Sequence, residues 1–199
     1  MRRINKTMQS RPIVRIRRAN QRDAAKIELL IREAFLEHEP AFTPEAFITA
    51  MPGKHEIEKR IEDWAVWIAV TANVIVGTVS AQAKGRRLQI RTMAVHPSMR
   101  GHGIGKMLLA RVEHFAYAHG YKRLSLNTTP FMNRAIRLYE AFGFRFTGSK
   151  WNWLGTWCRP MTKKLAAHTK DYVLPDSPTR GEGHGCRAYS PKTKPSLRL

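Results

Sequence analysis

The chain has 199 residues, 43% of them hydrophobic, and a formal net charge of +20 at pH 7. This length favours one domain with a sizeable core, and no segment approaches the run of about 18 apolar residues that a membrane span needs. Its two cysteines, Cys158 and Cys186, are too few for a disulfide framework or a metal site. We therefore expect no metal, no membrane contact and a reduced, cytoplasmic setting.

The first predicted elements are a short strand and two helical regions. Apolar residues at 13–16 predict the strand. Asn20 predicts a helix N-cap, because the apolar residues within 27–35 then recur at helical spacing. A second helical region begins near residue 44 and is broken by the Pro-Gly pair at 52–53.

Strands dominate the rest of the predicted order. Residues 64–71, 74–82 and 88–95 are apolar, alternating or β-branched, and turns separate them, which predicts an antiparallel meander. A long helix should run from Gly103 to a C-terminal glycine at Gly120. We expect the remaining elements at 124–128, 144–148 and 156–163 for strands and at 131–142 for a helix.

Composition predicts the domain organisation. Residues 12–166 carry the periodic elements and should form one domain of α+β class. Residues 1–11 are basic and polar, and we expect a flexible N-terminus. Residues 167–199 are rich in Pro, Gly, Ser and Lys, which predicts a disordered basic tail.

The stretch from Met93 to Gly105 carries the main functional signal. It reads as a strand end, a proline-bent turn, three glycines in five residues and the start of a helix. Such a turn leaves several backbone N–H groups unpaired at the positive end of a helix dipole, which is a receptor for an anion and most often for a phosphate.

Two familiar phosphate loops are excluded by spacing. Lys106 stands where a dinucleotide fingerprint needs its third glycine, and Met107 stands where a nucleoside-triphosphate loop needs Ser or Thr.

Two motifs resemble those of the GNAT superfamily of N-acetyltransferases. Arg100-x-x-Gly103-x-Gly105, after a Val-x-Pro strand exit, is similar to the family's acetyl-CoA loop. Residues 133–144, with an Asn, an Ala, a Tyr and a final Gly-Phe, are similar to its second signature. The resemblance implies a single GNAT-like α+β domain. Its sheet would be mixed but mostly antiparallel, with helices on both faces and a splayed pair of strands that admits CoA.

The resemblance also implies an activity, that of an acetyl-CoA-dependent N-acetyltransferase. The acetyl group would pass from the CoA thioester to a primary amine by direct attack in a ternary complex. Tyr139 would be the catalytic residue, beside the CoA sulfur, where it protonates the leaving thiolate. The alternative role for Tyr139 is packing on an apolar helix face.

The expected cofactor contacts follow from the same resemblance. The backbone of Met93 and Val95 would hold pantetheine, and the Val95 N–H would polarise the acetyl carbonyl. Asn133 would bond the pantetheine or the neighbouring strand, or else cap the helix or act in a turn near its start. The full set of expected cofactor-binding residues is Met93, Ala94, Val95, Arg100, Gly101, His102, Gly103, Ile104, Gly105, Lys106, Asn133 and Tyr139.

The charge pattern bears on the acceptor. Residues 20–63 hold six bases and ten acids, whereas residues 64–162 hold fourteen bases and two acids. The cationic part suits the phosphates of CoA, and the acidic part suits a cationic amine, although solvated helix faces explain the acids equally well. The acceptor is left open between a small molecule and a protein Lys or N-terminus.

The general base is not indicated by the sequence. Residues 88–95 contain no Asp or Glu, although many members of the family have a Glu on this strand. The candidates are Glu37, His38, Glu39 and His55, a water-mediated path, or no base at all if the amine arrives neutral.

Two other functions stay open at this level. One is a non-catalytic CoA-binding regulatory module on the same fold. The other is a nucleic-acid-associated protein whose basic ends make weak contact with the nucleic acid, although no recognition motif supports it. A homodimer is also left open.

Overall fold

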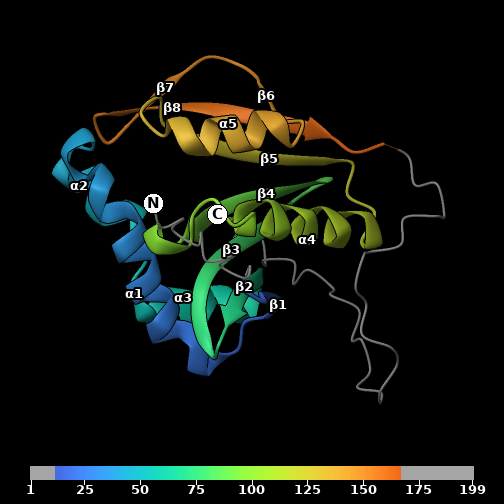
Figure 1. Ribbon diagram of the computed structural model, residues 1–199. Coiled ribbons are helices and arrows are strands. Elements are labelled where there is room, and N and C mark those ends of the chain that lie inside the picture. Colours follow the sequence, from blue (N-terminus) through green and yellow to red (C-terminus); the bar gives the residue numbers. More distant parts are fainter. Residues whose placement is uncertain (1–11, 167–199) are drawn as a thin grey trace, which may run out of the picture. The chain divides into compact units, whose positions relative to one another are not determined.

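The computed structural model describes residues 12–166 (Figure 1). The predictions for 1–11 and 167–199 lie outside the described residues, so the flexible ends and the domain boundaries beside them stay predictions. No helix in the described part of the chain combines the length and the apolar character that crossing a membrane requires.

The described elements follow the predicted order. The strands are β1 (Arg15–Arg18), β2 (Ala65–Thr71), β3 (Val74–Lys84), β4 (Arg87–Val95), β5 (Arg123–Thr128), β6 (Arg145–Phe146), β7 (Trp151–Trp153) and β8 (Thr156–Lys164). The α-helices are α1 (Ala24–Phe35), α2 (Pro44–Ala50), α3 (Lys54–Asp63), α4 (Ile104–Ala118) and α5 (Asn133–Ala141). Short 3-10 helices are η1 (Gln21–Asp23), η2 (Leu36–Ala41) and η3 (Pro97–Met99). Strand β7 was not expected from the sequence.

Local sequence explains where the helices start and stop. The Asn20 side chain accepts a hydrogen bond from the Arg22 N–H, and the Asp23 carboxylate accepts one from the Asn20 N–H at 2.8 Å. This reciprocal capping box starts the first helical segment, as the predicted N-cap required. Helix α4 ends just before Gly120, whose φ of 72° is typical of a residue that follows a helix.

The strands form a mixed, mostly antiparallel sheet, as expected. Its order is β1-β2-β3-β4-β5-β8-β6, and β7 pairs with β8. Strands β4 and β5 are parallel, and the other described pairs are antiparallel. The parallel pairing covers only Arg87–Gln89 against Arg123–Ser125. Beyond it the two strands splay, so the rest of β4 pairs with β3 alone.

Helices cover both faces of the sheet (Figure 1). Helix α4 packs over β1 to β5 on one face, where Trp67, Leu108 and Val112 are fully buried. Helices α1 and α3 pack on the other face, around Ile27 and Ile57. The splay between β4 and β5 thus opens in the middle of a well-packed domain.

Candidate active site

A pocket of about 910 Å³ occupies the gap between the splayed strands. Its walls come from the end of β4, the glycine loop and the starts of α4 and α5. Other parts of the wall belong to η2, α2, α3 and the β7–β8 hairpin. A pocket of this size suits an extended ligand of the dimensions of a cofactor.

The glycine loop presents bare backbone to the pocket. Gly101 and Gly103 have φ values of 83° and 79°, a left-handed conformation that glycine adopts without strain. A β-carbon on either residue would meet no atom within 4 Å, so open space lies beside the loop. The first hydrogen bond of α4 runs from the Met107 N–H to the Gly103 carbonyl at 3.1 Å. The three N–H groups before Met107 therefore precede the helix's own ladder and are free for an anion.

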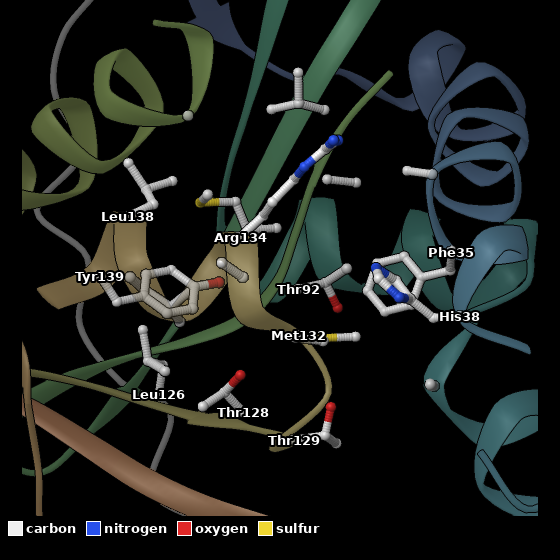
Figure 2. Close-up of a pocket in the computed structure, with 18 of the residues that line it drawn as sticks. Phe35, His38, Thr92, Leu126, Thr128, Thr129, Met132, Arg134, Leu138 and Tyr139 are labelled. Atoms are coloured by element: carbon white, nitrogen blue, oxygen red, sulfur yellow. The ribbon is translucent and has the colours of Figure 1, made fainter. Parts of the chain in front are cut away.

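Three cations line the pocket from the elements next to this loop. Lys106 belongs to the first turn of α4, and Arg134 and Arg137 belong to α5. Figure 2 shows Arg134 extended along the pocket. Together with the positive end of the α4 dipole, these side chains give this wall a positive potential that would suit phosphate groups.

The free edge of β4 turns backbone groups into the gap. The His96 N–H donates to the Val76 carbonyl of β3 at 3.0 Å. Since successive residues of a strand direct their backbone groups to opposite sides, Met93 and Val95 direct theirs away from β3. That side is the unpaired part of β4, so an extended ligand can hydrogen-bond there as an added strand would.

Tyr139 is buried on the inner face of α5, with 8% of its surface exposed. Its ring packs edge-on against Phe144, with ring centroids 5.9 Å apart. Figure 2 shows its hydroxyl directed toward the middle of the pocket. Burial raises the pKa of Tyr139 from 10.0 to about 12, so the phenol stays protonated at neutral pH and can donate a hydrogen bond or a proton.

Two buried hydroxyls in the pocket have no partner among the described residues. Thr128 and Thr129, at the end of β5, are each 5% exposed, and neither side-chain oxygen is hydrogen-bonded. Both line the pocket (Figure 2). A buried polar group without a partner costs free energy, so these hydroxyls are places where a polar ligand would be stabilised.

The family model for the Acetyltransferase (GNAT) family matches residues 30–144, which is more than half of the chain. The chain belongs to the GNAT family. The match spans α1 through the strand start after α5, and so it contains both the glycine loop and Tyr139.

Curated GNAT relatives share the sequence over part of their length. The chain is 39% identical to an N-acetylaspartate synthetase of Danio rerio over 111 residues, 55% of this chain and 33% of that protein. It is 33% identical to N-acetyltransferase 8B of Homo sapiens over 99 residues, 47% of this chain and 43% of that protein. The matched part is thus a third to under a half of these relatives' length.

Solved GNAT structures share the fold. The PaiA N-acetyltransferase of Thermoplasma acidophilum, in complex with coenzyme A, has a TM-score of 0.68 at 16% identity, covering 77% of this chain and 99% of that one. A ribosomal-protein-alanine N-acetyltransferase of Brucella melitensis has a TM-score of 0.62 at 22% identity, covering 76% of this chain and 99% of that one. The α+β fold expected from the GNAT motifs is therefore confirmed.

The pocket brings together the residues that the GNAT motifs singled out, with one exception. All of the expected cofactor contacts line it except His102, whose ring nitrogen lies 3.2 Å from the Arg100 carbonyl oxygen. The Arg100 guanidinium is engaged elsewhere, because it forms an ion pair with Glu37 and donates to the Ala34 carbonyl at 3.1 Å. Asn133 is the first residue of α5 and not its N-cap, and its role stays a prediction like the others.

Two of the four candidate bases reach the pocket. Glu37 and His38 line it, whereas Glu39 and His55 do not. The Glu37 carboxylate is shared with Arg100, so it is already paired. His38 lies on the opposite side of the pocket from Tyr139 in Figure 2, and its ring is 6.1 Å from that of Phe131.

Several pocket residues were missed by sequence reasoning. Arg134 and Arg137 lie inside the second GNAT motif, so their charge was a usable signal. Thr128, Thr129 and the tryptophans of β7 had no such signal, because ordinary strand residues become pocket walls only where strands part. Among the described residues, no cluster of His, Cys, Asp or Glu side chains could hold a metal ion.

Proposed function

We propose that the protein is an acetyl-CoA-dependent N-acetyltransferase that acts on a primary amine. The proposal rests above all on one juxtaposition. The free amides of the glycine loop and the hydroxyl of buried Tyr139 border the same pocket in a GNAT chain. The first feature fits a phosphate-bearing cofactor, and the second fits protonation of a leaving group.

The residues divide the work along the pocket. The loop amides, Lys106, Arg134 and Arg137 would hold the phosphates of acetyl-CoA. The free backbone groups of Met93 and Val95 would hold the pantetheine arm. When bound, acetyl-CoA supplies the acyl carbon and the leaving thiolate: an N–C bond forms, the C–S bond breaks, the amine loses a proton and the sulfur gains one.

Tyr139 would deliver the proton to the sulfur. A phenol with a pKa of about 12 is a weak acid, yet the apolar surroundings that raise its pKa would raise the pKa of a thiol in the same place. Burial thus raises the pKa of both the phenol and the thiol, so the difference between them is smaller than the raised pKa of Tyr139 alone suggests. A hydrogen bond from the hydroxyl to the sulfur also stabilises charge as it develops.

His38 would accept the amine proton. It borders the pocket from η2, and imidazole is the side chain most often used as a general base. Of the other candidates, Glu37 is paired with Arg100, and the side chain of His55 is 98% exposed on α3.

The acceptor class stays open between small amines and protein amines at this level. The names of the relatives point in different directions, since N-acetylaspartate synthetases are named for an acetylated amino acid and the Brucella protein for alanine of a ribosomal protein. A cytoplasmic location, a homodimer and weak nucleic-acid contact through the basic ends stay predictions. The alternative, a non-catalytic CoA-binding module, is distinguished from an acetyltransferase by the assay described next.

Thiol release from acetyl-CoA, followed over a panel of amino acids, polyamines, peptides and aminoglycosides, tests the proposal. We expect release with at least one class of amine and an acetylated product by mass spectrometry. Calorimetric binding of coenzyme A is the control. Binding without any acetyl transfer would favour the regulatory module, and the lack of binding would contradict the assigned cofactor.

A further inference from the structure

Besides Arg100, which is paired with Glu37, two arginines line the pocket without a part in the scheme above, Arg60 of α3 and Arg91 of β4. Arg60 is firmly held. Its guanidinium pairs with Glu56, donates to the Thr92 hydroxyl at 2.9 Å and stacks on the Trp64 ring at 4.9 Å. The side chain of Arg60 is 12% exposed, so its positive charge is largely shielded from water and acts on charged groups nearby.

The charge of Arg60 affects the pKa of Arg91. Arg91 is exposed at the rim of the pocket, where partial desolvation lowers its pKa first, the charge of Arg60 lowers it further, and Glu56 opposes both effects. Among residues 12–166, no hydrogen bond or ion pair engages the Arg91 guanidinium. Glu37, the only Asp or Glu that lines the pocket, is occupied by Arg100. The pocket thus contains an unpaired guanidinium beside a second cation, where an anion would be stabilised.

A β-bulge determines where Arg91 points. Thr92 pairs with Ser80 of β3 and Ile90 pairs with Ala81, so Arg91 is the extra residue of β4. Thr92 accepts a hydrogen bond from Arg60 of α3, so it faces the side of the sheet that α1 and α3 cover, and Arg91 lies beside it in the bulge.

This position separates Arg91 from the phosphate cradle. The glycine loop follows the far end of β4 and opens into α4, which covers the opposite face of the sheet. A phosphate held at the loop amides therefore leaves Arg91 unused. Arg91 is instead the chain neighbour of Thr92, and Figure 2 shows Thr92 on the side of the pocket that contains His38.

We propose that the acceptor amine carries a carboxylate of its own, as a free amino acid does, and that Arg91 binds this carboxylate. The proposal rests on the proposed acetyl transfer and names its substrate class. Arg60 contributes a second positive charge to this side of the pocket, which favours an anionic acceptor group. This reverses the preference for a cationic acceptor that the acids of 20–63 suggested, because Glu37 is the only one of those acids that lines the pocket.

The test compares L-amino acids with the amines that decarboxylation leaves, such as L-phenylalanine with phenethylamine and L-lysine with cadaverine. Rates are compared at equal concentrations of neutral amine, because removing the carboxylate changes the pKa of the amine. For a productive pair, one in which at least one member is acetylated, we expect kcat/KM to be about ten- to a hundredfold higher for the amino acid than for the amine. This is the effect expected of one hydrogen bond to a charged group.

Two arginines of the same strand give a matched comparison. Arg91→Met should abolish the preference by raising KM for the amino acid, while coenzyme A affinity and the rate with the decarboxylated amine stay unchanged. Arg87→Met, on an exposed residue of β4 outside the pocket, should keep the preference. Equal kcat/KM for both members of every productive pair, or a preference that survives Arg91→Met, would overturn the proposal.

The failure of acetyl transfer is distinguishable from the failure of this inference. If no amine is acetylated, the proposed function fails. The preference is then measured as the rise in melting temperature that each amino acid or amine produces in the presence of coenzyme A. A larger rise with amino acids that Arg91→Met removes supports the carboxylate site, and equal rises for both members of each pair contradict it.

Discussion

The Cδ2 atom of Leu138 in α5 lies 2.7 Å from the position that a β-carbon on Gly105 would take. Side-chain carbons do not approach each other this closely, so glycine at this place lets the first turn of α4 pack directly on α5. The contact joins the two helices that carry the loop amides and Tyr139. The packing of one small residue thus sets the distance between the two parts of the proposed active site.

Gly105→Val should therefore destabilise the protein by about 1–3 kcal/mol and weaken coenzyme A binding, because the added side chain must displace the Leu138 methyl or shift α4 against α5. Adding Leu138→Ala to this variant should restore part of the loss, since it removes the obstructing atoms. Chemical denaturation of the two single variants and the double variant measures the coupling. Strict additivity of the free-energy changes would contradict the contact.

Gly103→Val should abolish coenzyme A binding. Gly103 has a φ of 79°, and the valine side chain would stand in the open space beside the loop amides. Gly85→Val is the matched control, because Gly85 has a φ of 58° and equally open surroundings but lies in the β3–β4 turn. Both variants should lose about 1–3 kcal/mol of stability to backbone strain. If the Gly103 variant bound coenzyme A as the Gly85 variant does, the loop assignment would be wrong.

Tyr139→Phe should lower kcat about ten- to a hundredfold and leave KM for acetyl-CoA unchanged, since it removes only the proton donor. Initial rates of thiol release at varied acetyl-CoA concentrations measure both kcat and KM. An unaltered kcat over the whole pH range would remove Tyr139 from the mechanism.

The same variant has a signature in stability. The pKa of Tyr139 is raised from 10.0 to about 12, so its contribution is complete below pH 10 and is lost as the pH rises toward 12. The unfolding free energy of the wild type should fall more steeply over this range than that of Tyr139→Phe. Parallel curves would show that the hydroxyl is not buried.

His38→Gln should lower kcat/KM at neutral pH about ten- to a hundredfold, because the amine must then lose its proton to solvent. The defect should shrink as the pH rises and more of the amine arrives neutral. His55→Gln serves as the control, since that side chain is exposed and outside the pocket. A defect of constant size at every pH would exclude His38 as the base.

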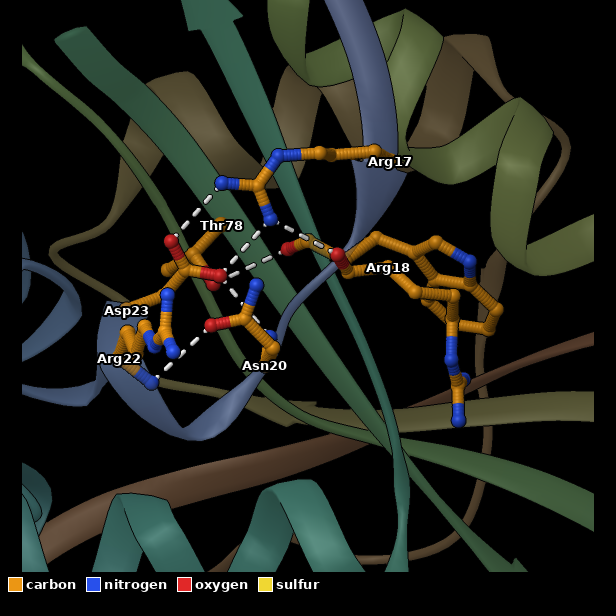
Figure 3. A network of polar contacts seen from close by, with 7 residues as sticks. Arg17, Arg18, Asn20, Arg22, Asp23 and Thr78 are labelled. Carbon is orange, nitrogen blue, oxygen red and sulfur yellow. Dashed lines mark hydrogen bonds and ion pairs between the residues drawn. The ribbon is translucent and has the colours of Figure 1, made fainter. Parts of the chain in front are cut away.

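The pair of Arg17 and Asp23 predicts an acid-dependent loss of stability (Figure 3). Arg17 donates to both carboxylate oxygens, at 2.7 and 2.8 Å, and its hydrogen bonds lower the pKa of Asp23 below 3.8. The stabilisation is complete above pH 3.8 and is lost as the pH falls through the lower, folded-state pKa. Asp23→Asn should cost about 1–2 kcal/mol at pH 7, toward the lower end for a charged hydrogen bond because Arg17 is half exposed.

Unfolding free energies measured from pH 7 to pH 2 check this expectation. The difference between the wild type and Asp23→Asn should narrow below pH 3.8, because protonation removes the charge that the variant lacks. A difference that stays constant down to pH 2 would show that the ion pair contributes nothing.

Features that depend on short stretches of chain were predictable from the sequence. The capping box at Asn20, the helix end before Gly120 and the glycine loop after Val95 all rest on the conformational freedom or hydrogen-bonding capacity of a few adjacent residues. The periodicity of apolar residues placed most of the strands and helices. Strand β7 was missed because three residues carry too little periodicity, and its pairing with β8 defines it.

Features that depend on segments meeting in space were not predictable. The ion pair of Arg100 with Glu37 joins the loop to η2, and the expectation that Arg100 also contacts the phosphates stays a prediction. The pairing of Arg60 with Thr92 likewise joins α3 to β4. Neither contact can be predicted from the residues next to it in the sequence, because its partners are far apart in the chain.

The sequence by itself determined the family, the α+β fold and the loop that can hold a diphosphate, because backbone freedom at glycine and the start of a helix are local properties. Only the tertiary structure decided the rest of the pocket. The parallel register of β4 and β5 is short and the strands part beyond it, and the bulge leaves Arg91 as an extra residue beside Thr92, which Arg60 contacts. These depend on long-range packing, in which residues far apart in the chain compete for the same space, and so the charge that we propose for acceptor binding became visible only in the folded molecule.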